Sequence, residues 1–88
     1  VTTFTLGQNY PNPFNPVTNI RYSNPSQSRV RLSVFNLKGQ MVKEVVNGVQ
    51  SPGNYTVSLD ASGLGSGIYF YRLDTATGSI TRKMVLTK

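Results

Sequence analysis

Gly67-Ile68-Tyr69-Phe70-Tyr71-Arg72-Leu73-Asp74 is the stretch that decides the fold. It is the longest dense run of β-branched and aromatic residues in the chain, and glycine-containing segments bound it on both sides, as is typical of a β-strand. Both faces of this strand are largely apolar: Ile68 and Phe70 on one, and Tyr69, Tyr71 and Leu73 on the other. Strands with two apolar faces usually lie inside a sheet. We therefore predict a central strand here.

The start of this strand resembles the corner of immunoglobulin-type domains. Gly67 stands two residues before Tyr69, and Tyr71 stands two residues after it, where immunoglobulin domains carry a cysteine. The chain contains no cysteine. We therefore expect the bulk of Tyr71 to fill the space that a disulfide would otherwise occupy.

Turn residues punctuate the whole chain. Glycine, proline and asparagine recur about every 8–12 residues, which favours short strands over long helices. Strands are predicted at residues 4–6, 17–23, 29–35, 41–46, 54–59, 67–74 and 79–88. This pattern predicts a single all-β domain over residues 1–88, an Ig-like or fibronectin-type antiparallel β-sandwich of about seven strands. A five-stranded barrel of the oligonucleotide-binding type is the alternative.

Alternation within these strands predicts which side chains enter the core. The residues predicted to point inward are Ile20, Tyr22, Val30, Leu32, Val34, Tyr55, Val57, Leu59, Met84 and Leu86. Arg29, Arg31 and Ser33 are predicted to lie on the outer face of their strand. Leu64, alone among small residues in the loop before Gly67, is predicted to close one end of the core.

The segment 8–16 is predicted to be a stiff, extended crossover. Its three prolines lack backbone donors and restrict the residues before them, so it cannot be an interior strand. We expect the side chains of Tyr10 and Phe14 to enter the core.

Three further segments are predicted to be turns. Residues 36–39 fit a type I turn with Asn36 first and Gly39 fourth. Asn47-Gly48 and Pro52-Gly53 are turn dipeptides, and the short segment between them is expected to cross from one sheet to the other.

The composition leaves little material for catalysis. The chain has neither cysteine nor histidine, and its acids are Glu44, Asp60 and Asp74. Gly63-x-Gly65-x-Gly67 precedes a predicted strand instead of a helix, so it lacks the context of a phosphate-binding loop. We therefore expect no catalytic residues and no cofactor.

Two kinds of binding site, for a metal ion and for nucleic acid, have partial support in the sequence but are not favoured. Asp60, Asp74, Asn12 and Asn15 could supply oxygen ligands to calcium, although none stands in a spaced Asp-x-Asp pattern and turn capping explains each. The net charge of +6 permits an anionic partner. Aromatic rings among basic residues could also stack on nucleic acid, but these rings fall at inward positions. Core packing is the favoured interpretation, and we expect neither a metal site nor nucleic-acid binding.

The chain shows no targeting or membrane segment of its own. No run approaches the roughly 18 apolar residues of a membrane-spanning helix, and no signal peptide is present. Because the chain starts at Val1 and not at methionine, we expect it to be a piece cut from a longer protein, whose own targeting segment lies outside this sequence.

Four segments together resemble a known family. Residues 8–22, 34–40, 66–73 and 81–88 are similar, in the same order, to the type A C-terminal sorting domains of the type IX secretion system of the Bacteroidetes and their relatives. The Ig-like domain of flagellar hook-capping proteins is a related module. The resemblance covers nearly the whole chain, so it is more specific than any single motif.

The resemblance implies a sorting signal and not a catalyst. Domains of this family end large secreted proteins, and the machinery recognises them from the periplasmic side. The outer-membrane translocon exports the cargo that precedes the domain, and a sortase-like peptidase then removes the domain, often leaving the cargo on anionic lipopolysaccharide at the cell surface. Cleavage would fall at or before residues 1–4.

The resemblance also assigns roles to residues. The recognition residues it implies are Lys83, Met84, Val85, Leu86, Thr87 and Lys88 in the last strand, with Gly67 and Tyr69 as a second motif. The structural residues it implies are Tyr10, Pro11, Asn12, Pro13 and Phe14, with Gly39 in the first hairpin. Alternation in 83–88 is compatible with an edge strand that a partner captures by strand addition. The alternative function is an Ig-like accessory module that binds a glycan or an assembly partner.

Overall fold

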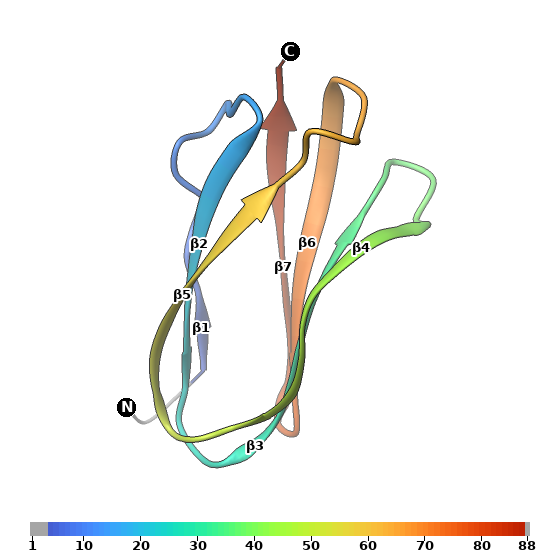
Figure 1. Ribbon diagram of the computed structural model, residues 1–88. Helices are drawn as coiled ribbons and strands as arrows, with labels where there is room; N and C mark the ends of the chain where they lie inside the picture. The colour runs from blue at the N-terminus through green and yellow to red at the C-terminus, as the bar shows by residue number, and fades with distance from the viewer. Residues whose placement is uncertain (1–3, 88) are drawn as a thin grey trace.

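Two antiparallel sheets pack face to face in the computed structural model, which describes residues 4–87 (Figure 1). The three-stranded sheet has the order β1-β2-β5 and the four-stranded sheet the order β4-β3-β6-β7. The strands are β1 Thr5–Leu6, β2 Val17–Asn24, β3 Ser28–Phe35, β4 Met41–Gln50, β5 Gly53–Asp60, β6 Gly67–Thr75 and β7 Gly78–Leu86. Seven strands in two separate sheets confirm the Ig-like sandwich over the barrel alternative.

Strand β6 is central, as its two apolar faces predict. It pairs with β3 on one side and with β7 on the other. Tyr71 and Leu73 are fully buried between the sheets, while Ile68 and Phe70 lie on the outer face and are less covered. The predicted assignment of this strand is therefore confirmed.

The core draws on both ends of the chain. All of the inward residues predicted for β2, β3 and β7 are buried, and Tyr55, Val57 and Leu64 pack partly buried against them. The buried apolar residues are Leu6, Phe14, Ile20, Tyr22, Val30, Leu32, Val34, Leu59, Ala61, Tyr71, Leu73, Met84 and Leu86. Residues far apart in sequence must therefore meet before the core forms.

Tyr10 does not enter the core, contrary to the prediction. Its side chain is 80% exposed. The backbone N–H and C=O of Tyr10 both bond to Asn19, at 2.9 Å each, in an isolated antiparallel bridge. Side chains of directly opposed residues share one face of a sheet. Because Asn19 faces solvent, Tyr10 faces solvent too.

The predicted turn at Asn47-Gly48 is also wrong. Strand β4 continues through it to Gln50, with Asn47 opposite Arg31 and Gly48 opposite Val30. The Arg29 guanidinium donates to Asn47 Oδ1 at 2.6 Å. Cross-strand pairing overrides the local preference for a turn, and the chain changes sheets only after Gln50.

Ser33 is buried, although alternation places it on the outer face of β3. It lies opposite Glu44 on one side and Arg72 on the other, and a register shift separates it from Leu32. Its hydroxyl has no hydrogen-bond partner among the described residues. Ser33 thus lies between the long side chains of Glu44 and Arg72, and the prediction that it is exposed to solvent is wrong.

Candidate functional site

Strand β7 lies at one end of the four-stranded sheet, as expected of a terminal edge strand. Met84 and Leu86 point inward and are buried, whereas Lys83 and Thr87 are exposed and Val85 is half-buried. The inward and outward faces are those that alternation predicts. Lys88, the last of the proposed recognition residues, lies outside the described residues, as do residues 1–3 of the expected cleavage region.

The outer edge of β7 is already occupied by the crossover segment 8–14, which we call the clasp. Phe14 N–H donates to the Val85 carbonyl at 3.0 Å, and Thr87 N–H donates to the Phe14 carbonyl at 2.9 Å. These two bonds form a parallel bridge between Phe14 and Leu86. One residue of the clasp therefore acts as an added strand along the end of β7.

Side chains of the clasp extend this contact. Asn12 Oδ1 accepts the Val85 N–H at 3.0 Å, and Gln8 Nε2 donates to the Lys83 carbonyl at 2.9 Å. With the Phe14 bonds, the clasp uses hydrogen-bonding groups from Lys83 to Thr87. A partner strand could add to this part of β7 only by displacing the clasp.

Buried contacts hold the clasp in place. The Phe14 ring is almost fully buried in the core. Asn9 is buried as well, and its amide donates to the Thr18 hydroxyl and to the Pro11 carbonyl, both at 3.1 Å. These contacts explain why a segment without regular secondary structure can keep one conformation.

Tyr71 links the clasp to the central strand. Its hydroxyl donates to the Gly7 carbonyl at 2.7 Å and accepts the Asn9 N–H at 2.8 Å. Burial raises the pKa of Tyr71, and the Asn9 N–H and the nearby Arg82 partly offset this. Tyr71 thus does more than fill space by bulk, a role that only the tertiary contacts reveal.

Gly67 and Tyr69 lie directly beside the end of β7. Gly67 pairs with Leu86, and Tyr69 pairs with Met84. Gly67 has φ 150°, which a side chain would strain. Tyr69 is half-buried, and its hydroxyl donates to the Gly65 carbonyl at 2.7 Å. A tyrosine that bonds back to the backbone a few residues upstream is the tyrosine corner of Ig-like domains, so the predicted corner is confirmed.

Gly39 closes the β3–β4 hairpin at the same end of the sandwich (Figure 1). Its φ is 81°, and its N–H donates to the Asn36 carbonyl at 3.0 Å, as the predicted turn requires. Asn36 Oδ1 accepts the N–H groups of Lys38 and Gln40. This tight hairpin leaves the Leu37 side chain 67% exposed.

Two shallow hollows lie beside this hairpin, at the same end of the four-stranded sheet. Their volumes are about 290 and 250 Å³, and both are lined by Asn36 and Leu37. The first reaches Gly67, Ile68 and Tyr69, and the second reaches Phe35, Phe70 and Arg72. The Arg72 guanidinium carbon lies 4.7 Å from the centre of the Phe35 ring, a cation–π contact. The sequence predicts Ile68 and Phe70 as an apolar strand face but does not assign Leu37 to a site, although a leucine between Asn36 and Lys38 in a turn is a usable signal.

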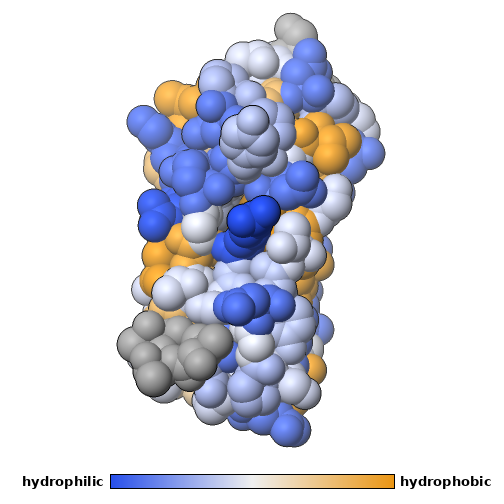
Figure 2. Space-filling view, turned by 90° about the vertical axis from the view of Figure 1, so that its left-hand side faces the viewer, coloured by the Kyte–Doolittle hydropathy of each residue, from blue (hydrophilic) through white to orange (hydrophobic). Residues whose placement is uncertain are grey.

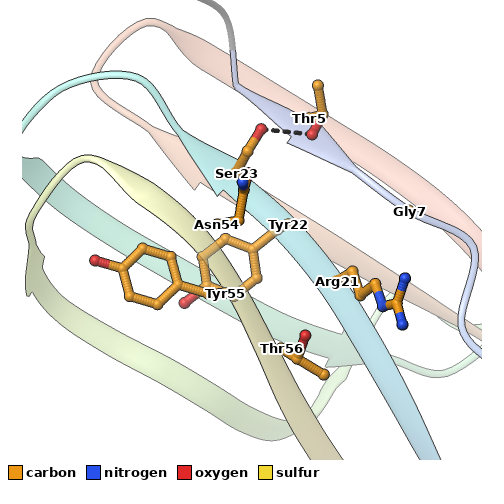
Figure 3. Close-up of a pocket in the computed structure, with 8 residues that line it drawn as sticks. All are labelled: Thr5, Gly7, Arg21, Tyr22, Ser23, Asn54, Tyr55 and Thr56. Carbon is orange, nitrogen blue, oxygen red and sulfur yellow. Dashed lines mark hydrogen bonds between the residues drawn. The ribbon is translucent and has the colours of Figure 1, made fainter. Parts of the chain in front are cut away.

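A further hollow of about 420 Å³ lies on the three-stranded sheet (Figure 3). Arg21 and Thr56 border it, and the hydroxyls of Thr5 and Ser23 lie 2.5 Å apart at its edge. Figure 2 shows that this side of the molecule is mostly hydrophilic, with separated hydrophobic spots. None of the residues that the resemblance assigns lines this hollow.

The three acids are engaged in surface pairs or turns. Glu44 pairs with Arg31 at 3.0 Å, and Asp74 pairs with Arg72 at 3.1 Å. The Asp60 carboxylate accepts the Ser62 N–H at 2.9 Å, which lowers the pKa of that carboxyl. Within residues 4–87, no three acidic, histidine or cysteine side chains come together as a metal site would need, and no helix is long and apolar enough to cross a membrane.

Comparison with known proteins places these features in a family. No curated protein matches the chain. Among solved structures, the crystal structure of dimeric latent PorU from Porphyromonas gingivalis matches with a TM-score of 0.70 at 17% identity, and the match covers 99% of this chain. The chain spans only 10% of that PorU chain, and this likeness concerns the fold alone.

The family match is specific and nearly complete. The family model described as "Secretion system C-terminal sorting domain" matches residues 8–87, from the first residue of the clasp to the end of the described chain. The clasp, the tyrosine corner and β7 all fall inside this range. The chain belongs to the secretion system C-terminal sorting domains, the family of sorting signals for type IX secretion.

Proposed function

We propose that this domain is a passenger tag, which carries a cargo domain on its N-terminal side through the type IX machinery to the outer-membrane surface or the medium. The single observation that supports this most strongly is the family match over residues 8–87. The domain works by being bound: it crosses the periplasm folded, the translocon exports it with the cargo, and a sortase-like peptidase separates the two. It performs no reaction of its own.

The recognition surface in this proposal is the end of the sandwich where the segments that resemble the sorting-domain family meet. Gly67 and Tyr69 pair with Leu86 and Met84 there, and the clasp covers the edge of the same strand. Inward Met84 and Leu86 support the fold, so Lys83 and Val85 of β7, with Thr87 directly after it, are available for contact. Lys88 extends this set.

The experiment is an export assay with a reporter. Residues 1–88 are fused to the C-terminus of a reporter that carries a periplasmic signal peptide, in a bacterium with type IX machinery. We expect the fusion on the cell surface or in the medium, and the reporter without the domain in the periplasm. A fusion that stays in the periplasm while folded would overturn the proposal.

The contribution of β7 is tested with a charge reversal. Lys83→Glu changes an exposed side chain of β7, and Arg29→Glu is the matched reversal at the far end of the same sheet. We expect Lys83→Glu to lower export about tenfold, the effect of losing one well-placed interface contact, and Arg29→Glu to leave it unchanged. Equal export of both variants would show that Lys83 is not part of the recognition surface.

A second candidate function is an accessory module that binds a glycan. The polar hollow bordered by Arg21, with the exposed Tyr10 ring near it, favours this candidate. Binding on a glycan array that Arg21→Ala abolishes and Lys83→Glu preserves would support it. Absence of any glycan bound by the wild-type domain would dismiss it.

A further inference from the structure

The clasp limits how the secretion machinery can bind β7, because it occupies the outer backbone edge of that strand. From Lys83 to Thr87, groups on the outer edge of the strand bond to Gln8, Asn12 and Phe14. The Phe14 side chain is 1% exposed, so removing the clasp would also expose a large apolar ring. Burial of such a ring is worth roughly 1.5–3 kcal/mol. The outer face of the sheet, in contrast, is open without any rearrangement.

The open face carries a cluster of apolar side chains at one end, which we call the terminal face. Leu37, Met41 and Ile68 are 67%, 47% and 37% exposed. Strand pairing makes the cluster continuous, because Phe35 is opposite both Met41 and Phe70, and Ile68 is opposite Val85. The terminal face comprises Phe35, Leu37, Met41, Ile68, Phe70 and Val85. Clustered exposed apolar residues mark interaction surfaces more often than isolated ones do.

The terminal face is also hollowed and positively charged. Its two hollows share Leu37, and Lys38 and Arg72 are the charged residues that line them. Lys83 stands opposite Phe70 on the same face. Among residues 4–87 the ion pairs use Arg31 and Arg72, so neither Lys38 nor Lys83 has a carboxylate partner there. A complementary surface would place apolar side chains in the hollows and carboxylates around them.

We infer that the terminal face is the docking surface for the secretion machinery, and that its partner is a protein surface with protruding apolar side chains surrounded by Asp or Glu. This inference rests on the proposed function. It assigns recognition to side chains of β6, β7 and the β3–β4 hairpin together, with the clasp remaining in place. The β7 edge then serves to hold the fold and is not the contact itself.

The test uses the reporter fusion with aspartate placed on the terminal face. Ile68→Asp and Leu37→Asp put a charge into the hollows, and Val49→Asp is the matched control. Val49 is 65% exposed on β4 and lies opposite Arg29, at the other end of the same sheet. Thermal unfolding of each purified variant shows whether it is folded. We expect export of Ile68→Asp and Leu37→Asp to fall about tenfold or more, with Val49→Asp exported normally.

Lys38→Glu and Lys83→Glu test the charge of the partner. We expect each to reduce export of the folded fusion, with Lys38→Gln less affected than Lys38→Glu because it adds no repulsion. Normal export of folded Ile68→Asp and Leu37→Asp would overturn the inference, as would an equal loss in Val49→Asp. If the wild-type fusion is exported, either of these results leaves the proposed function intact. If the folded wild-type fusion is not exported, the proposed function itself is refuted.

Discussion

Tyr71 shows how one side chain can replace a structural device that the chain lacks. It occupies the position of an immunoglobulin cysteine, and its hydroxyl bonds to Gly7 and Asn9 in the neighbouring segment. A disulfide would connect two sheets covalently. Here a buried hydroxyl connects the central strand β6 to the clasp at Asn9 and to Gly7, the residue before the clasp.

Tyr71→Phe is expected to lower the free energy of unfolding by about 1–3 kcal/mol, because it leaves the buried Asn9 N–H without an acceptor. Urea unfolding followed by circular dichroism measures the change. Tyr10→Phe is the matched control, since the Tyr10 side chain is 80% exposed and its loss of a hydroxyl should have almost no effect. Equal stability of the two variants would show that the Tyr71 bonds contribute little.

The same residue predicts a loss of stability in alkali. Burial raises the pKa of Tyr71 above its ordinary value of 10.0, so the unfolded chain releases this proton at lower pH than the folded one. The stabilisation is complete below about pH 10 and is lost as pH rises through the folded pKa. The free energy of unfolding should therefore fall as the pH rises through this range, and it should fall less steeply in Tyr71→Phe. A slope unaffected by the substitution would contradict the assignment.

Ser33 is expected to be a site where stability can be gained. Its buried hydroxyl has no partner among the described residues, and such a group costs roughly 1–3 kcal/mol. Ser33→Ala removes the hydroxyl and little volume, so the urea midpoint should rise. Ser58→Ala, at an exposed position of β5, serves as the control. A lower midpoint for Ser33→Ala would mean that the hydroxyl has a partner, such as water.

At the scale of the element, the clasp pairs with β7 like a short extra strand, although its sequence lacks the alternating apolar pattern of a β-strand. Only Phe14 pairs through its backbone with β7, and Asn12 and Gln8 contribute side-chain bonds. Edge strands invite pairing with other chains, and proteins often cover them with a loop. The clasp protects the outer edge of β7 in this way.

Asn12→Ala should loosen the clasp locally. The Val85 N–H loses its acceptor, so hydrogen exchange at the Val85 amide should accelerate about tenfold, while amides of the central strand β3 keep their protection. Asn15→Ala is the matched control, because Asn15 is exposed and its side chain makes no hydrogen bond to any other residue in the described range 4–87. Unchanged exchange at Val85 in Asn12→Ala would show that this bond does not protect the edge.

Elements with strong local patterns could be predicted from the sequence, and those set by distant partners could not. The two apolar faces of residues 67–74 predict a central strand because burial on both faces is a property of the strand itself. Asn47-Gly48 resembles a turn until β3 pairs with it. The clasp bonds join residues as far as 75 positions apart, as between Gln8 and Lys83. No local pattern in residues 8–16 indicates that pairing. The sequence therefore predicts a crossover but does not predict that the crossover bonds to the edge of β7.

At the scale of the whole molecule, the proposed recognition residues and the hydrophobic core share the same strand. Gly67 and Tyr69, which lie on β6, pair with the inward residues of β7, and the clasp holds its outer edge. The proposed site could be predicted only in part, because the terminal face also needs Leu37 and Met41 from the β3–β4 hairpin. That face exists only when three segments of the chain have folded together. Machinery that reads it would therefore select folded domains.

This sharing predicts that removing residues 83–88 unfolds the domain. The deletion takes away Met84 and Leu86, both buried, and losing one such side chain typically costs about 2–5 kcal/mol. A domain of this size has a total stability of roughly 4–13 kcal/mol. Nuclear magnetic resonance spectra of the truncated chain should therefore lose their dispersion, whereas Lys83→Glu should keep it. If the truncated chain kept a cooperative thermal transition at the wild-type temperature, the terminal strand would be dispensable for the fold. Recognition and folding would then be separable, which the packing of β7 against Phe14, Tyr69 and Tyr71 argues against.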